Sequence, residues 1–365
     1  MGEKKILVAG GGPAGLNCAY WASKDGHEVT VFEVEGELAS KPCGELISDE
    51  ALDFTPLNND SSWVLNRVRR CLIYCDGKFI RELEPSSRPD IPLALLRGYS
   101  IDKKGFLQDL KSAAESAGAR IHFNKKVTHK NIHDEEFDMI VDATGYPRVL
   151  GRSVGVNDGS ERLATCKMGY YKGELNPDTT ILNMLDRGYA WLFPHDELIN
   201  FGVGGFYDKK ALDKLYEKNI RTFELEPPHE NLKPRTTPIF LGGPINQLRK
   251  EKLIITGEAA GTTMPTTGEG IRFALWSGSI CYKKNYEELF ANEYGKKLKF
   301  GRKLLEVILE LNVEERLKIA NGSPEFLSAL AGGDLPRIRD LAQFPWLIRY
   351  IGKLWRPFLP TKKKA

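Results

Sequence analysis

Short hydrophobic runs separated by glycine dominate the beginning of the chain. Residues 6–9 predict a buried strand, residues 13–24 an amphipathic helix that ends before Gly26, and residues 28–33 a second strand. A strand, a helix and a strand in this order form the repeating unit of a parallel sheet. The same pattern predicts further elements of this kind, namely helices over 106–117 and 270–282 and strands over 120–123, 137–141 and 253–256.

A second pattern, in which hydrophobic and polar residues alternate, interrupts these elements. Residues 71–81, 93–100 and 165–205 predict antiparallel strands, and the proline-rich run 227–238 predicts a surface crossing. Helices are expected after Tyr286. The predicted fold class is therefore α/β, a doubly wound Rossmann-like domain with an inserted antiparallel-sheet substrate domain and a helical C-terminus. The predicted boundaries are 1–70, 99–155 and 251–285 for the doubly wound domain, 71–98 and 156–250 for the inserted domain, and 286–365 for the helical region.

Composition narrows the class of protein without identifying its chemistry. The chain has 365 residues, 41% of them hydrophobic and 28% charged, as in an ordinary globular protein, and its net charge of +3 gives no support to a nucleic-acid partner. No apolar run reaches the roughly 18 residues of a membrane-spanning helix. The six cysteines contain no CxxC pair, which favours reduced thiols in a cytoplasmic protein. No His, Cys and Asp cluster has metal-ligand spacing, so we expect no metal.

The first motif with clear chemistry is the glycine-rich turn at residues 10–15, Gly-Gly-Gly-Pro-Ala-Gly. Gly10 permits the tight turn out of the strand, Gly12 lets the backbone approach a pyrophosphate, and Gly15 lets the helix pack closely. The helix N-terminus offers free N–H groups to the phosphates. Glu33 ends the second strand, where its carboxylate can accept hydrogen bonds from a ribose. This motif alone does not distinguish FAD from NAD.

Two later motifs indicate FAD. Residues 137–145 form a buried strand that ends in Ala-Thr-Gly, a pattern that passes close to FAD in many flavoproteins. Residues 253–261 form a strand that leads, through Gly270, into a helix whose N-terminus can face a flavin. Glu258 can bind ribityl hydroxyls, and the backbone N–H groups of Gly270 and Ile271 can stabilise negative charge on the reduced ring.

The three motifs, in this order, resemble the FAD-dependent hydroxylase superfamily, which includes hydroxylases, halogenases and prenyl reductases. Two further segments resemble one branch, the geranylgeranyl reductases: Pro-Cys-Gly within residues 40–45 and Tyr-x-Trp-x-Phe-Pro within residues 188–194. A halogenase fits less well, because Tyr189 stands where that branch has the first Trp of its own segment. The resemblance covers roughly residues 5–285 and weakens beyond them.

The resemblance implies a set of cofactor-binding residues. Lys103 stands where the family often has Arg, so a phosphate contact is expected without the bidentate fork of a guanidinium. Val127 is expected in a strand on the adenine side, and Glu258 is one methylene longer than the usual Asp. The residues expected to bind FAD are Gly10, Gly12, Ala14, Gly15, Glu33, Cys43, Gly44, Lys103, Val127, Glu258, Gly270 and Ile271.

The implied activity is reduction of carbon–carbon double bonds in isoprenoid chains, such as those of membrane lipid precursors, by hydride transfer from N5 of reduced FAD. The catalytic candidates are Cys43, Tyr189 and Trp191. The thiol of Cys43 would orient the substrate or supply a proton, although free cysteines are more often small buried hydrophobes. Tyr189 and Trp191 would line a tunnel for the isoprenoid, although alternating aromatic residues are more often plain core. His195 is expected to be a surface histidine.

Two other functions share the flavin motifs. A flavin monooxygenase that hydroxylates an aromatic or quinone substrate would consume oxygen, and a non-catalytic flavin protein would bind lipid without turnover. No second nucleotide motif is present, so the expected electron donor is external: NAD(P)H, ferredoxin or another reductant.

The last residues, 344–365, place Trp, Leu, Tyr and Ile on one stripe of a helix, with Lys and Arg beside it. Such a helix suits peripheral attachment to a membrane surface, or equally a helix packed on the body of the protein. An isoprenoid substrate favours the first of these.

Overall fold

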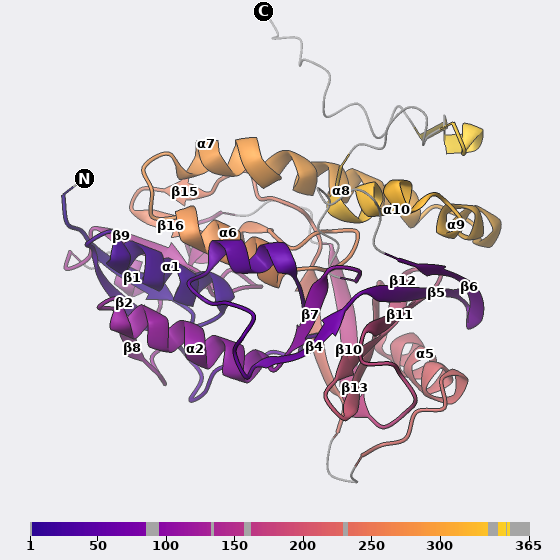
Figure 1. Ribbon diagram of the computed structural model, residues 1–365. Helices are drawn as coiled ribbons and strands as arrows, with labels where there is room; N and C mark the ends of the chain where they lie inside the picture. The colour runs from indigo at the N-terminus through magenta and orange to yellow at the C-terminus, as the bar shows by residue number, and fades with distance from the viewer. Residues whose placement is uncertain are drawn as a thin grey trace, which may run out of the picture.

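The computed structural model describes residues 2–84, 95–132, 135–156, 162–228, 233–334, 342–347 and 349–350. These residues form two large sheets that lie side by side, with a small sheet between them and a layer of C-terminal helices above (Figure 1). The α/β fold class predicted from the sequence, with its inserted antiparallel sheet and helical C-terminus, is confirmed.

The first large sheet is a parallel sheet extended by one antiparallel edge strand. Its order is β15-β16-β9-β1-β2-β8, and only the β15–β16 pair is antiparallel. The central strands are hydrophobic throughout because helices and loops cover both faces. The strands are β1 (Lys5–Ala9), β2 (Glu28–Phe32), β8 (Arg120–His122), β9 (Met139–Asp142), β15 (Arg249–Lys250) and β16 (Leu253–Ile255).

Three helices pack together on one face of this sheet: α1 (Pro13–Lys24), α2 (Lys103–Ser116) and α6 (Ile271–Ile280) (Figure 1). Two short helices, α3 (His129–Ile132) and α4 (Val149–Ser153), lie in its connections. Helices α1 and α6 approach very closely, because a Cβ on Gly278 would lie 2.3 Å from the carbonyl oxygen of Ala14. Asn17 fixes the same crossing by donating to the carbonyl oxygen of Leu275 at 2.7 Å.

The second large sheet has the order β14-β10-β13-β12-β11-β5-β6 and is antiparallel except for the β11–β5 pair. One face packs against α5 (Lys209–Thr222), a helix that the sequence did not predict. Side chains alternate along β12, so that Leu192 faces α5 whereas Tyr189, Trp191 and Phe193 face the other way. The strands are β5 (Arg70–Cys75), β6 (Lys78–Leu83), β10 (Leu163–Tyr171), β11 (Thr179–Met184), β12 (Gly188–His195), β13 (Leu198–Gly205) and β14 (Arg235–Phe240).

Two local predictions for these strands were wrong. The run 227–238 is not only a surface crossing, because it leads into β14, which pairs with β10. Pro238 is tolerated there because β14 is the edge strand of the sheet, and one side of an edge strand needs no backbone donor. The strand predicted over 93–100 begins only at Gly98, because Leu95 and Leu96 form a turn; residues 85–94 lie outside the described residues.

The small sheet joins the two large ones. Strand β7 (Gly98–Ile101) lies between β3 (Leu46–Ser48) and β4 (Val64–Val68), and the short helix η1 (Asp49–Phe54) follows β3. Because β7 pairs with β3 and β4, it belongs to neither large sheet.

The chain after β16 is helical, as expected. Its elements are η2 (Gly257–Ala260), which precedes α6, and then α7 (Tyr286–Phe290), η3 (Ala291–Gly295), α8 (Lys296–Ile308), α9 (Val313–Ala320), α10 (Pro324–Gly332) and η4 (Pro345–Leu347).

The described part of the C-terminal tail packs on the body of the protein. Phe344, Leu347 and Tyr350 are buried in one cluster with residues of α8 and α10. Most of the predicted helix over 344–365 lies outside the described residues. No helix among the described residues is long and apolar enough to cross a membrane.

The close crossing of α1 and α6 yields a stability prediction. We expect Gly278→Ala to lower the free energy of unfolding by about 1–3 kcal/mol, because the new methyl group meets backbone that has no room to move. Thermal and urea unfolding followed by circular dichroism would measure the change. Ser279→Ala, at the next position of the same helix, is the matched control; equal stability of the two variants would contradict the crossing described here.

Candidate functional site

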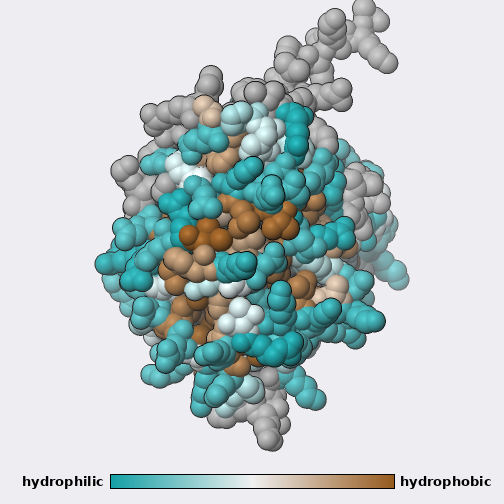
Figure 2. Space-filling model, turned by 90° about the vertical axis from the view of Figure 1, so that its right-hand side faces the viewer, coloured by the Kyte–Doolittle hydropathy of each residue, from teal (hydrophilic) through white to brown (hydrophobic). Residues whose placement is uncertain are grey.

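A single cavity of about 760 Å³ runs from the glycine-rich turn to the C-terminal helices. It is lined by the carboxyl ends of β1 and β2, by the aromatic face of β12 and by residues of α8, α9 and α10. Most of its lining is apolar, and Figure 2 shows apolar side chains gathered around hollows on one face of the molecule. All the predicted site residues line this cavity except Gly15.

The glycine-rich turn has the geometry of a dinucleotide site. Gly10 has a φ of +108°, and a Cβ on Gly15 would lie 1.9 Å from the carbonyl oxygen of Gly10. Gly15 therefore serves the packing of α1 and does not line the cavity. A Cβ on Gly12 would meet no atom within 4 Å, so the backbone there faces open space. Helix α1 has no side-chain cap, which leaves its first N–H groups available for a phosphate.

The residues expected on the ribose and adenine side line the same end of the cavity. The carboxylate of Glu33 accepts hydrogen bonds from the backbone N–H of Gly11 at 2.5 Å and of Glu35 at 2.9 Å. Val127 is buried there, but it lies in a loop and not in the predicted strand, because β8 ends at His122. Lys103 begins α2, and its ammonium donates to the carbonyl oxygen of Lys41 at 2.7 Å.

Glu258 is a second carboxylate that lines the cavity. Its carboxylate forms a 2.5 Å ion pair with Lys41 and accepts a hydrogen bond from the backbone N–H of Phe240 at 3.2 Å. Lys41 belongs to the loop that carries Cys43, so this ion pair fixes that loop to the start of η2. No motif in the sequence indicated a contact between residues 41 and 258.

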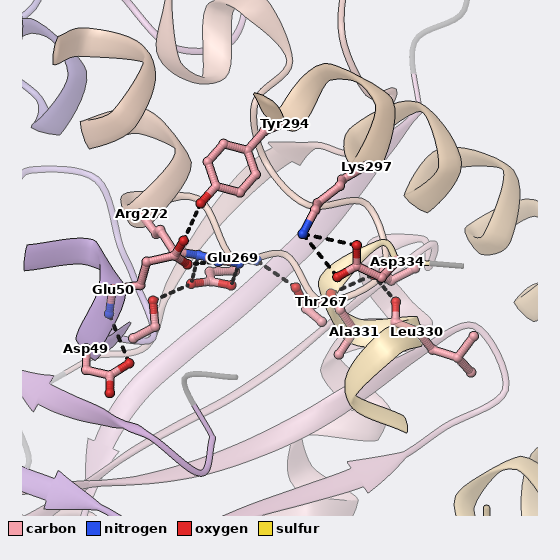
Figure 3. Close-up of polar contacts among 12 residues, drawn as sticks. Asp49, Glu50, Thr267, Glu269, Arg272, Tyr294, Lys297, Leu330, Ala331 and Asp334 are labelled. Carbon is pink, nitrogen blue, oxygen red and sulfur yellow. Dashed lines mark hydrogen bonds and ion pairs between the residues drawn. The ribbon is translucent and has the colours of Figure 1, made fainter. Parts of the chain in front are cut away.

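A buried ion network supports the loop that precedes α6 (Figure 3). The guanidinium of Arg272, 3% exposed, donates through Nε and Nη2 to both oxygens of Glu269 at 2.9 Å and also pairs with Glu50. Burial opposes this charge, but the carboxylates of Glu269 and Glu50 outweigh it and raise the pKa of Arg272. Tyr294 donates to Glu50 as well. Glu269 lines the cavity, so the network holds Gly270 and Ile271 in place at its wall.

The aromatic residues of β12 form one wall of the cavity and do not pack in a closed core. Tyr189 donates through its hydroxyl to the carbonyl oxygen of Thr267, which ties β12 to the loop before α6. Trp191 lies over Gly202 of β13, where a Cβ would come within 2.1 Å of the indole. The sequence signal for this arrangement is the alternation of glycine along β13, Phe-Gly-Val-Gly-Gly, which leaves space beside the predicted aromatic residues.

Glu45 is an important cavity residue that sequence reasoning missed. It is 8% exposed, and its Oε2 accepts hydrogen bonds from Tyr170 at 2.6 Å and from Asn200 at 3.0 Å. The Nε2 atom of His195 lies 3.0 Å from the same oxygen, so His195 is a partner of the site and not the surface histidine that was expected. Within the described part of the chain, no donor reaches the second oxygen of Glu45.

Cys43 lies beside this group. The backbone N–H of Glu45 donates to the Cys43 sulfur at 3.3 Å, and Asn200 donates to the Cys43 carbonyl oxygen at 3.0 Å. Asn200 also accepts a hydrogen bond from the indole of Trp191 at 3.0 Å. The structure therefore brings Cys43 and Trp191, two of the three predicted catalytic residues, together around Asn200.

The protonation states of this group follow from its surroundings. Burial opposes ionisation of Glu45, but hydrogen bonds from His195, Tyr170 and Asn200 outweigh it and lower the pKa of the carboxyl group. Burial, and then the negative charge of Glu45, raises the pKa of Tyr170. At neutral pH, Glu45 is therefore a carboxylate surrounded by hydrogen-bond donors.

Comparisons with known proteins agree with this picture, although no family model matches the chain. The digeranylgeranylglycerophospholipid reductase of Methanococcus vannielii is 26% identical over 96% of this chain and 97% of its own length. The enzyme of the same name from Thermoplasma acidophilum is 26% identical over 79% of both chains. Among solved structures, a geranylgeranyl bacteriochlorophyll reductase-like protein of Thermoplasma acidophilum has a TM-score of 0.78 at 20% identity and covers 97% of this chain.

The fold and the site together define a flavoprotein oxidoreductase. Other flavin-dependent enzymes share this fold: the structure of the brominase Bmp2 has a TM-score of 0.69 at 15% identity. Within that class, the chain is similar over most of its length to digeranylgeranylglycerophospholipid reductases and to a geranylgeranyl reductase-like structure. The predicted resemblance is therefore confirmed. It extends further than the sequence indicated, since the similarity to the Methanococcus enzyme covers the C-terminal region as well.

The lowered pKa of Glu45 gives a pH prediction. A carboxyl group whose pKa is lower in the folded state than in the unfolded state adds stability above the unfolded pKa, about 4.3, and loses it as the pH falls through the folded pKa. We expect Glu45→Gln to destabilise the protein by about 1–3 kcal/mol at pH 7 and by less at pH 3. Urea unfolding at both pH values would measure this, with the exposed Glu174→Gln as control. If Glu45→Gln lowered the free energy of unfolding more at pH 3 than at pH 7, the prediction would be contradicted.

Proposed function

We propose that this chain binds FAD in the cavity and reduces carbon–carbon double bonds of isoprenoid lipid chains. The observation that carries the proposal is the continuity of one cavity from dinucleotide-type residues, such as Gly12 and Glu33, to an apolar arm beneath the C-terminal helices. A flavin and a hydrocarbon could therefore occupy the same cavity. The names of the relatives, digeranylgeranylglycerophospholipid reductases, support an isoprenoid lipid as the substrate.

The residues present fit FAD. The open backbone at Gly12 and the uncapped start of α1 would hold the pyrophosphate, Glu33 the ribose, and Glu258 with the loop at Gly270 the flavin end. Bound in its reduced form, FAD would supply a hydride at N5. We further propose that segments 1–70, 99–155 and 251–285 carry the cofactor, segments 71–98 and 156–250 the substrate, and that 286–365 closes the site.

The protein's own contribution would be positioning and the exclusion of water. An isolated alkene has no carbonyl group to polarise, so its reduction depends on holding the chain in a dry site against the hydride donor. The middle of the cavity suits this task, because Cys166, Met168 and Leu182 line it between Trp191 and the C-terminal helices. Burial raises the pKa of the Cys166 thiol to about 12, so it adds no charge there at neutral pH.

Reduction also needs a proton on the second alkene carbon. His195, whose side chain is 18% exposed, touches solvent on one side and Glu45 on the other. Glu45 lines the cavity beside Cys43 and has one oxygen without a donor among the described residues. We propose that His195 and Glu45 bring the proton from solvent to the cavity and that Cys43 orients the chain or passes the proton on.

The electron donor would be external, because the described cavity holds the features of one dinucleotide site only. NAD(P)H, ferredoxin or another reductant would meet the flavin transiently. Attachment of residues 344–365 to a membrane surface stays a prediction for the part beyond Tyr350.

The activity can be tested directly. The purified chain should bind FAD, seen by absorbance and by quenching of flavin fluorescence. Under anaerobic conditions, with dithionite as reductant, it should reduce the double bonds of a geranylgeranyl lipid. Mass spectrometry should then show the mass of the lipid rising by two hydrogen atoms for each double bond reduced. No mass gain with a fully reduced flavin would refute the proposal. Rapid oxygen uptake with NAD(P)H and an aromatic substrate would favour the monooxygenase instead.

The proton path makes a separate prediction. Glu45→Gln should slow single-turnover reoxidation of the reduced flavin by the lipid by about 10²–10⁴-fold, because general acid–base steps contribute this much. His195→Gln should change the pH dependence of the same rate. Tyr170→Phe removes one donor to Glu45 but keeps the carboxylate, and should act weakly. Wild-type rates in both Glu45→Gln and His195→Gln, with normal flavin content, would exclude this path.

A further inference from the structure

The apolar arm of the cavity ends at a buried cation. The arm lies between the inner face of the second large sheet and the C-terminal helices, and its walls include Ile73, Met184, Ile308 and Leu327. At the end near α9 the lining changes to Arg316 and Arg187. Charged groups are costly in such surroundings unless a partner of opposite charge is present.

Arg316 has hydrogen bonds but no counter-ion among the residues that the structure describes. It is 5% exposed, and its Nη1 donates to the carbonyl oxygens of Leu311 at 2.7 Å and Asp186 at 3.3 Å. Its Nε is buried without a partner. No carboxylate of the described residues lies within 4.0 Å of the guanidinium, whereas the equally buried Arg272 has two, Glu269 and Glu50.

The neighbouring turn between β11 and β12 adds a second cation. Arg187 is exposed and lines the same end of the cavity, and the described residues form no ion pair with it. The neighbouring acid, Asp186, also lines the cavity, and its carboxylate accepts a hydrogen bond from the Tyr207 hydroxyl at 2.8 Å. Tyr207 also accepts a hydrogen bond from the backbone N–H of Arg187 at 3.0 Å, which fixes the turn. The end of the arm therefore has two guanidinium groups and one carboxylate that already accepts a hydrogen bond from Tyr207.

We propose that Arg316 and Arg187 bind the phosphate of the isoprenoid substrate, with the hydrocarbon lying along the apolar arm toward Tyr189. This inference rests on the proposed function and adds to it the head group and the direction in which the chain enters. A guanidinium with unused N–H groups recognises phosphate through charge-assisted hydrogen bonds. The phosphate could belong to a glycerophospholipid or to a prenyl phosphate; the chemistry at Arg316 is the same.

Binding without turnover tests the site independently of the reductase activity. The FAD-loaded protein would be titrated with phytanyl phosphate and with phytanol, which share one saturated chain and differ only in the phosphate, and tryptophan fluorescence would report binding. We expect the wild type to bind the phosphate more tightly than the alcohol. Arg316→Gln should weaken binding of the phosphate by about 10- to 100-fold and leave the alcohol unchanged. Arg316→Lys should retain part of the preference.

Two further variants guard against a folding artefact. Arg187→Gln changes an exposed side chain and should weaken phosphate binding by a smaller factor. Lys318→Gln removes an exposed cation from the same helix, outside the cavity, and should change nothing. Unchanged phosphate preference in both Arg316→Gln and Arg187→Gln, with normal flavin content, would overturn the inference even if the protein reduces lipids.

Turnover then distinguishes the sources of the phosphate. The KM values for geranylgeranyl phosphate and for digeranylgeranylglycerol phosphate would be compared between wild type and Arg316→Gln, with geranylgeraniol as the neutral reference. The substrate whose KM rises more, at constant kcat, is the one whose phosphate reaches Arg316. If the wild type binds phytanyl phosphate in an Arg316-dependent manner but reduces no lipid, the proposed function fails while the phosphate site stands.

Discussion

The packing of Trp191 over the glycines of β13 is the contact on which the cavity depends. In an ordinary antiparallel pair, a side chain on β13 would stand beside the indole, but Gly202 has none, and a Cβ there would come within 2.1 Å of the ring. Gly44 approaches the indole from the loop, since a Cβ on Gly44 would be 3.5 Å from its Nε1. The loop carrying Cys43 and Glu45 rests on this aromatic wall, and the space above the wall stays open for a ligand.

The charges of the site differ in how far the protein itself matches them. Arg272 is neutralised by Glu269 and Glu50. Two groups that line the cavity are matched less completely by the described residues: one oxygen of Glu45 has no donor, and the guanidinium of Arg316 has no carboxylate partner. Because an unmatched buried charge costs free energy, such groups are retained where a ligand or a reaction uses them.

Sequence reasoning succeeded where the signal was local. The glycine turn, Glu33 and the strand–helix unit around Glu258 lie within short segments whose spacing reflects one backbone conformation, and they do line one cavity. It failed where partners are distant along the chain: Glu45 meets Tyr170 across 125 residues and Asn200 across 155. Nothing in a hydrophobic pattern encodes such pairs, and the helical C-terminus, which supplies Arg316, had no motif to mark it.

The two unmatched groups also have a consequence for how the site could work. Reduction of an alkene by a bound hydride donor benefits from a site that water does not enter. Here Glu45 lies beside the Cys43 loop, Arg316 lies by α9, and the lining near Met168 and Leu182 is apolar. A chain anchored by its charged end at Arg316 would lie along this apolar stretch, so that a double bond further along the chain would reach the Cys43 loop, where the proposed proton path ends.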